Sequence, residues 1–87
     1  MPPPTKPPAT LADVPVGRRA RVVRVEGDRA LRVRLWEMGL SAGTEVDVLK
    51  RAPMGDPLEL RLRGYHLSLR RAEAGRVWVV PIEGGGA

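Results

Sequence analysis

The stretch LELRLRGYHLSLR, residues 58–70, alternates apolar and polar side chains with one interruption at Arg63 and Gly64. Because successive side chains of a strand point to opposite faces of a sheet, the alternation predicts two strands with one buried face each. The interruption predicts a two-residue hairpin turn between strands at 58–63 and 65–70. The side chains expected inside are Leu58, Leu60, Leu62, Tyr65, Leu67 and Leu69.

Further short strands are predicted on both sides of this hairpin. Gly43 opens a turn into a strand at 44–50, whose Val46 and Val48 share one face. The cluster PMGDP, with Gly55, Asp56 and Pro57, predicts the turn that follows. A turn at 71–75 leads to a last strand, RVWVVPI, at 76–82. A first strand is expected at 20–25, although adjacent valines, Val22 and Val23, break its alternation.

One helix is predicted between the first two strands, over residues 29–38. Asp28 is a good N-cap, because its carboxylate can accept a free N–H of the first turn. Gly39 is expected at the position after the helix, where a left-handed conformation costs glycine little, with Leu40 packing back toward Leu35. The overall prediction is a mainly β fold, a small five-stranded barrel with this one α-helix.

The ends of the chain differ in composition from its middle. Residues 1–9 hold five prolines and predict an extended or disordered tail, and the glycine-rich residues 83–87 predict a flexible end. The folded domain is expected over 10–82, opening with a short helical turn capped by Thr10 and Asp13. The start of the sequence has no apolar signal-peptide region, so a cytoplasmic location is expected.

The composition limits the classes of function. The 87 residues favour one domain, and the absence of cysteine excludes disulfides, thiolate metal sites and cysteine nucleophiles. No apolar run approaches the about 20 residues of a membrane span. The net charge of +5, carried mostly by arginine, is compatible with acidic partners, but ordinary solvated arginines are the preferred explanation.

No arrangement of residues typical of catalysis is found, so the chain is not expected to be an enzyme. His66 is the one histidine, and it falls on an outward strand face. It could join acidic residues as a ferrous-iron ligand, but none has convincing ligand spacing, except that Asp47 lies near Glu45. These acidic residues are His66's candidate partners: Glu37, Asp47, Asp56, Glu59 and Glu73. No metal site or cofactor is predicted, with weak transition-metal binding left open.

Nucleic-acid binding finds little support beyond charge. Arg61, Arg63 and Arg70 could line an outer face, but single-strand binding needs aromatic platforms, and only Trp78 is available there. No specific nucleic-acid partner is expected.

The predicted helix carries two apolar stripes where a barrel needs one. Leu31, Leu35 and Met38 form the first stripe. Val33, Trp36 and Leu40 form the second, on nearly the opposite side, which is then either half-exposed or used by a partner.

Four segments in this order resemble the FeoA family: RLWEMGLSAG (34–43), PMGDPLEL (53–60), GYHLSLRRAEA (64–74) and RVWVV (76–80). Gly39, Gly43, Gly55, Asp56, Pro57 and Gly64 belong to these segments as structural motif residues. The resemblance implies an SH3-like barrel that assists FeoB, a membrane ferrous-iron permease with a cytoplasmic G domain. It places the chain at the membrane only through that partner.

The resemblance also sets the partner-binding hypothesis and its alternative. The predicted partner-binding residues are Val33, Leu35, Trp36 and Leu40, with Leu35 aligned with a family leucine near the partner contact. The alternative is a free regulatory module that senses a transition metal or binds a protein segment, as the related domain of DtxR-type repressors does. Whether the chain forms a homo-oligomer is left open. It is also left open whether the chain alters GTP hydrolysis by the permease, gates the permease or assembles it.

Overall fold

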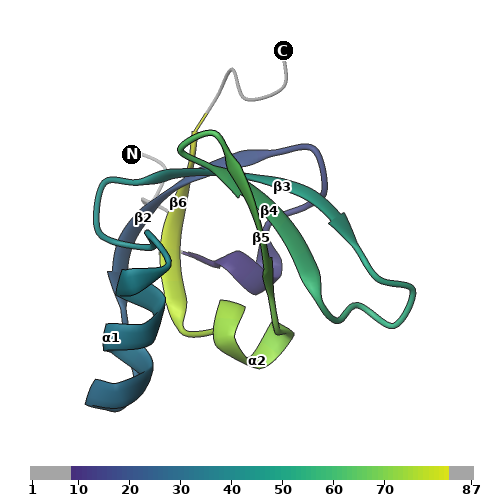
Figure 1. The fold of residues 1–87 in the computed structure, drawn as a ribbon. Helices are drawn as coiled ribbons and strands as arrows, with labels where there is room; N and C mark the ends of the chain where they lie inside the picture. Colours follow the sequence, from purple (N-terminus) through teal and green to yellow (C-terminus); the bar gives the residue numbers. More distant parts are fainter. Residues whose placement is uncertain (1–8, 83–87) are drawn as a thin grey trace, which may run out of the picture.

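The alternating segments form one antiparallel sheet in the computed structural model, which describes residues 9–82 (Figure 1). The strands lie side by side in the order β1-β6-β2-β3-β4-β5. Their bounds are β1 (Ala9–Thr10), β2 (Arg19–Val25), β3 (Glu45–Arg51), β4 (Leu58–Leu62), β5 (Tyr65–Leu69) and β6 (Val77–Ile82). The mainly β prediction is confirmed.

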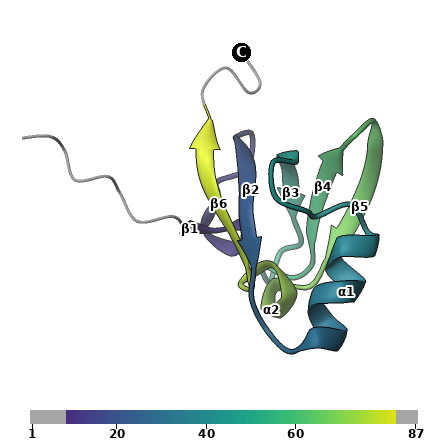
Figure 2. The ribbon, with the colours of Figure 1, turned by 90° about the vertical axis from the view of Figure 1, so that its left-hand side faces the viewer.

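The sheet curls so that its two halves face each other across an aliphatic core. Figure 2 shows β6 and β2 as one wall and β3, β4 and β5 as the other. The predicted inward residues of β3 and β4 are buried between these walls, as are alternate residues of the opposite wall. The buried strand residues are Ala20, Val22, Val46, Val48, Leu58, Leu60, Leu62, Leu69, Val77 and Val79.

The hairpin at Arg63 and Gly64 forms as predicted. Both residues have positive φ, 52° and 84°, which is the backbone of a tight two-residue turn that matches the twist of the strands. The turn sets the register in which Leu60 lies opposite Leu67.

Two residues of β5 that were predicted inside are less buried than expected. The side chain of Tyr65 is 42% exposed, and Leu67 is only half-buried. Among residues 9–82, β5 is an edge strand of the sheet, so its side chains have a neighbouring strand on one side only. Alternation in the sequence predicts which face a residue takes and does not predict how well that face is covered.

The helices include one more than expected. α1 (Arg29–Glu37) lies between β2 and β3 as predicted, and the 3-10 helix η1 (Leu11–Asp13) forms the predicted first turn. Residues 71–75, expected as a plain turn, contain a short helix, α2 (Arg71–Ala74). Its first turn is held by the Glu73 carboxylate, which accepts the backbone N–H of Arg70 at 3.1 Å.

The sixth strand, β1, is a correction to the predicted five. Ala9 and Thr10 pair with Val79 and Trp78 of β6, and two residues are too few to show an alternation. The sequence predicts Ala9 as part of the tail, and the structure places it in β1. The rest of the predicted tail and the predicted end at 83–87 lie outside the described residues.

The adjacent valines of β2 mark a β-bulge. The register of β2 against β6 shifts between Val22 and Arg24, so that Val22 is buried and Val23 is exposed. Beyond the bulge β2 diverges from β3, with which it pairs only over Arg19–Arg21, and turns toward α1.

Candidate functional site

The helix α1 begins at the predicted cap and buries the predicted stripe. The Asp28 carboxylate accepts the backbone N–H of Leu31 at 2.9 Å. Leu35 is fully buried, and Leu31 and Met38 pack against the core from the sides. α1 is therefore attached to the barrel along one face.

The other face of α1 keeps large apolar side chains in solvent. Val33 is 39% exposed and Trp36 is 65% exposed. Trp36 carries the largest exposed fraction among the aromatic residues of the chain. An exposed tryptophan beside a valine is a small apolar surface of the kind that partners cover.

The end of α1 is a six-residue Schellman motif around Gly39. The Gly39 N–H donates to the Trp36 carbonyl at 2.9 Å, and the Leu40 N–H donates to the Leu35 carbonyl at 3.0 Å. Gly39 has a φ of +99°, as predicted. The motif turns the chain back so that Leu40 is fully buried under the helix end.

Two contacts fasten the far flank of α1. The Tyr65 hydroxyl of β5 donates to the Met38 carbonyl, and Arg34 forms an ion pair with Glu73 of α2. These contacts hold α1 toward β5 and α2 and leave its opposite flank facing β2.

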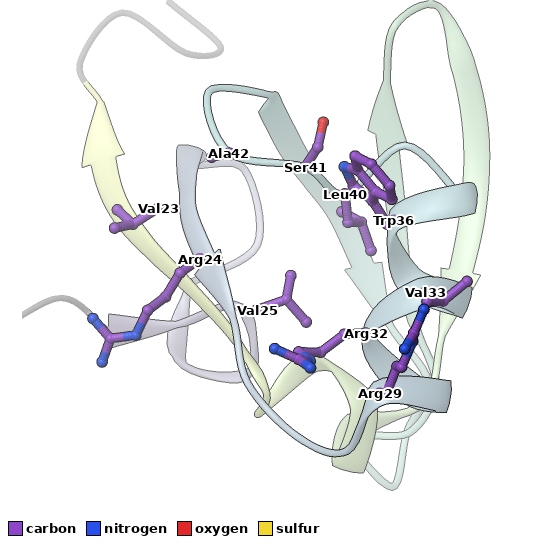
Figure 3. Close-up of a pocket in the computed structure, with 10 residues that line it drawn as sticks. All are labelled: Val23, Arg24, Val25, Arg29, Arg32, Val33, Trp36, Leu40, Ser41 and Ala42. Atoms are coloured by element: carbon purple, nitrogen blue, oxygen red, sulfur yellow. The ribbon is translucent and has the colours of Figure 1, made fainter.

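A groove of about 370 Å³ lies between that flank and β2 (Figure 3). Val23 and Val25 of β2 line one wall, and Val33 and Trp36 of α1 line the other. The segment from Leu40 to Ala42 closes the top end. In Figure 3 the Val25 side chain points into the space between the walls, whereas the Val23 side chain points away from α1.

Arginines from both walls reach the groove, but their charges are used differently. Arg24 turns away from α1, with its guanidinium 5.4 Å from the centre of the Trp78 ring and 2.9 Å from the Glu26 carboxylate. The Trp78 indole N–H and then Arg24 hold the pKa of Glu26 below its usual range. Arg24 is thus neutralised on the outer face.

Arg29 and Arg32, in contrast, have no ion pair and no side-chain hydrogen bond within residues 9–82. Both line the groove from α1. The helix wall of the groove therefore carries two uncompensated positive charges.

A second hollow, near the hairpin tip, is internally compensated. Asp47 accepts from Arg19 at 2.8 Å and from Arg61 at 3.3 Å, and Glu45 lies beside Arg19 and Arg21. These hydrogen bonds, that of Arg19 first, hold the pKa of Asp47 below its usual range although partial burial opposes the shift. The Asp47 carboxylate in turn raises the pKa of Arg19.

The structure separates the predicted partner-binding residues into two kinds. Val33 and Trp36 are exposed at the groove, whereas Leu35 and Leu40 are fully buried. Leu40 lies under the top end of the groove without exposed surface, and Leu35 lies inside the core beneath α1 and offers no surface either. Its role in any contact is to position the helix.

Sequence reasoning missed the β2 wall and the two arginines. The signal was present in the adjacent valines, because a bulge is what turns Val23 outward and carries Val25 toward α1. The sequence predicts a docking groove where the helix meets the barrel, but the residues it indicates come from the helix and the turn after it alone.

The residues considered for metal binding are spread over the surface. Asp47 and Glu73 bind arginines, the Asp56 carboxylate accepts the Arg71 N–H at 3.0 Å, and His66 lies opposite Arg61 on an exposed face. Within residues 9–82, no three histidine or acidic side chains come together as a metal ion would require.

The arginines considered for nucleic acid are likewise engaged in part. Arg61 binds Asp47, and Arg63 donates to the Thr44 hydroxyl at 3.1 Å. Trp78 is covered on one face by Arg24, so it offers no open platform on that face.

Comparisons with known proteins give a consistent family signal. The model of the FeoA domain matches residues 9–81. The Fe(2+) transport protein A/Fe(2+) transporter FeoB fusion protein of Porphyromonas gingivalis is 39% identical over 69 residues, which is 79% of this chain and 8% of that protein. The chain therefore spans a small part of this curated relative.

Solved structures confirm the SH3-like fold. The FeoA-like protein from Clostridium acetobutylicum superposes with a TM-score of 0.82 at 36% identity, covering 90% of this chain and 91% of that one. FeoA of Stenotrophomonas maltophilia, solved with zinc and described as an SH3 domain protein, gives 0.70 at 34% identity, covering 80% and 87%. A manganese-dependent transcriptional repressor gives 0.81 at 23% identity, covering 91% and 39%, a likeness of fold alone.

Among the described residues, no helix has the length and apolar character needed to cross a membrane.

Proposed function

Because the chain belongs to the FeoA domain family, as its sequence segments predicted, we propose that it is a non-enzymatic accessory protein of ferrous iron transport. It acts by docking on a FeoB-type permease or on the cytoplasmic G domain of that permease. Its place is the cytoplasmic side of the membrane, which it reaches through this partner.

The observation that carries the proposal is the exposed apolar surface of α1. Trp36 keeps 65% of its surface in solvent beside a groove, although the core of the barrel is already complete without it. Tryptophan is enriched among the residues that dominate binding energy at protein contacts, because it buries a large area and loses few rotamers. A docking role accounts for this exposure.

The choice of FeoB as partner is supported by the Porphyromonas gingivalis relative. In that protein a segment 39% identical to this chain is part of one polypeptide with a FeoB transporter. Two units that are joined in one chain act at the same place, so a separate FeoA-type chain is expected to meet its FeoB partner by surface contact.

The experiment is a direct binding measurement with purified components. The chain is titrated into detergent-solubilised FeoB-type permease and, separately, into the isolated G domain, each with and without a non-hydrolysable GTP analogue. Saturable binding to either form, reduced by Trp36→Ala, supports the proposal. No saturable binding to the permease or the G domain in any nucleotide state refutes it.

A further inference from the structure

We propose that the groove between β2 and α1 binds an extended segment of a partner protein in which apolar and acidic side chains alternate. The backbone of this segment pairs with β2 at Val25, and its carboxylates meet Arg29 and Arg32. The inference rests on the proposed function in taking this groove as the docking surface, and it specifies what docks there.

At Val25, β2 has an edge with which no other strand pairs within residues 9–82. The Glu26 N–H donates to the Arg76 carbonyl at 2.8 Å, so it points toward the β6 side. Because backbone groups of consecutive strand residues point to opposite sides, the N–H and C=O of Val25 point away from β6, toward the side on which β3 pairs with the earlier residues of β2. Strand β3 is not there to receive them, since it pairs with β2 only over Arg19–Arg21.

The helix α1 forms no hydrogen bond with this edge of β2 in the described part of the chain. Within residues 9–82 no hydrogen bond from outside the β2–β6 ladder reaches Val25, and the groove occupies the space between Val25 and the helix. Figure 3 shows the Val25 side chain pointing toward α1 across that space. An unpaired strand edge in a hollow of this kind is a template for an added strand.

The groove also offers apolar side chains to an occupant. An added strand would place every second side chain against Val25, Val33 and Trp36, the lining residues that keep apolar surface exposed. These residues match an apolar side chain at alternate positions of the segment. The same alternation leaves the intervening side chains facing outward, where Arg29 and Arg32 of α1 lie.

The helix wall of the groove carries positive charge. Arg29 and Arg32 lie in the first turns of α1, and the first turn holds no acidic residue. The positive end of a helix dipole disfavours cations there, although the N-cap carboxylate of Asp28 is close in sequence to both arginines. Arg32 extends from α1 toward β2 (Figure 3), and neither arginine has an ion-pair partner within the described residues. Carboxylates on the occupant would compensate both.

Other occupants fit the groove less well. A second copy of the chain would bring its own excess of positive charge, +5, against Arg29 and Arg32. A nucleic acid would satisfy the arginines but would leave the apolar lining and the strand edge unused. The combination of edge, lining and charge matches an acidic, apolar, extended peptide.

The test uses the full chain, labelled with ¹⁵N, and four capped peptides of equal length followed by NMR titration. The first peptide alternates valine and glutamate. The second replaces glutamate with lysine, the third has the first sequence with alternate backbone nitrogens methylated, and the fourth is all glutamate. We expect the first peptide to shift the Val25 amide and the Trp36 indole, and the other three to bind at least about tenfold more weakly.

A charge reversal with a matched control sharpens the test. The double variant Arg29→Glu/Arg32→Glu should lose the glutamate peptide and gain the lysine peptide, and glutamate near the start of α1 suits the helix dipole, so the fold should persist. Arg18→Glu/Arg70→Glu makes the same change in net charge at two exposed arginines away from the groove and should leave the preference unchanged. Melting curves of both variants verify folding.

Several results would overturn the inference. Equal binding of the all-glutamate peptide would mean nonspecific charge attraction, equal binding of the methylated peptide would mean that the β2 edge is unused, and a dimer with a buried groove in sedimentation would mean that a second copy occupies it. FeoB binding that persists in Arg29→Glu/Arg32→Glu while no peptide binds would leave the proposed function standing and this inference refuted. Peptide binding as expected with no FeoB binding would support this inference and refute the proposed function.

Discussion

Gly39 lies directly against Tyr65: a β carbon at residue 39 would sit 2.5 Å from the Tyr65 hydroxyl oxygen. That hydroxyl donates to the carbonyl of Met38, one residue before the glycine, where α1 ends. A helix end leaves its last carbonyls without partners inside the helix, so a hydroxyl from β5 satisfies one of them. The glycine and the tyrosine together fix where the helix stops against the sheet.

Tyr65→Phe should therefore destabilise the fold modestly. The variant removes the hydrogen bond to Met38 and keeps the ring, so we expect a loss of about 1 kcal/mol in the free energy of unfolding, measured by urea titration. Ser68→Ala on the same strand removes a hydroxyl with no partner within the described residues and serves as the control. A loss in Tyr65→Phe no larger than in Ser68→Ala would contradict the assigned role of this bond.

Gly39→Ala should be costlier than Gly43→Ala, although both glycines have nearly the same φ, 99° and 92°. A left-handed alanine costs roughly 1–2 kcal/mol at either position. At Gly43 nothing lies within 4 Å of the added carbon, whereas at Gly39 it meets the Tyr65 hydroxyl. Urea titration of the two variants isolates the cost of that clash.

The double variant Gly39→Ala/Tyr65→Phe provides the check. Removing the hydroxyl should recover part of the excess loss, so the two substitutions should be less than additive. Strict additivity would show that the clash is relieved by a movement elsewhere.

Trp36→Ala should separate binding from stability. Because the side chain is largely exposed, the free energy of unfolding should change by no more than about 0.5 kcal/mol, while affinity for the FeoB-type partner should fall by about 2 kcal/mol. Calorimetric unfolding and a binding titration on the same sample measure both. Leu35→Ala is the matched opposite on the neighbouring helix position, with an expected loss of stability of about 2–5 kcal/mol. If Trp36→Ala unfolds like Leu35→Ala, the docking surface lies elsewhere.

Acid should weaken the fold through Asp47. Arg19 and Arg61 hold the pKa of Asp47 lower in the folded chain than in the unfolded chain, so the ionised form favours folding. This contribution is present above the ordinary aspartate range, near pH 4, and is lost as the pH falls through the lower folded value. Thermal melts of Asp47→Asn and the unaltered chain should differ at neutral pH and converge in acid. Parallel curves at all pH values would exclude Asp47 as a source of the acid sensitivity.

The isolated chain should bind ferrous iron or zinc only weakly. No three of its histidine and acidic side chains come together among residues 9–82, so no ready set of ligands exists there. Isothermal titration under anaerobic conditions should give no saturation at micromolar protein. A submicromolar dissociation constant that disappears in His66→Ala would reverse this prediction.

The sequence pattern predicted the fold well in strands whose alternate side chains define one buried face. The leucines of 58–62, the valines of 46–48 and the Arg63-Gly64 turn all behaved as their alternation and turn chemistry required. The same rule failed for Tyr65 and Leu67, because burial on an edge strand depends on what neighbours it. That neighbour is a property of topology and is not encoded in the local pattern.

The site was predicted only in its helical half. Trp36 and Val33 stood out because a helix has a periodic face, and both are exposed as the second stripe required. Val25 and the arginines of the first turn gave no such signal, since their importance comes from the bulge that brings β2 opposite α1. A pair of residues that meet only after folding cannot be identified from spacing alone.

The bulge in β2 also has a consequence for motion. Ahead of it the strand is bonded on two sides, so the amide of Val22 should exchange its hydrogen with water only when the whole barrel opens. Past it the strand is bonded on one side, and the amide of Val25 should exchange through small local fluctuations that leave the core closed. One part of β2 is thus rigid and the other part is flexible, and the flexible part forms a wall of the groove.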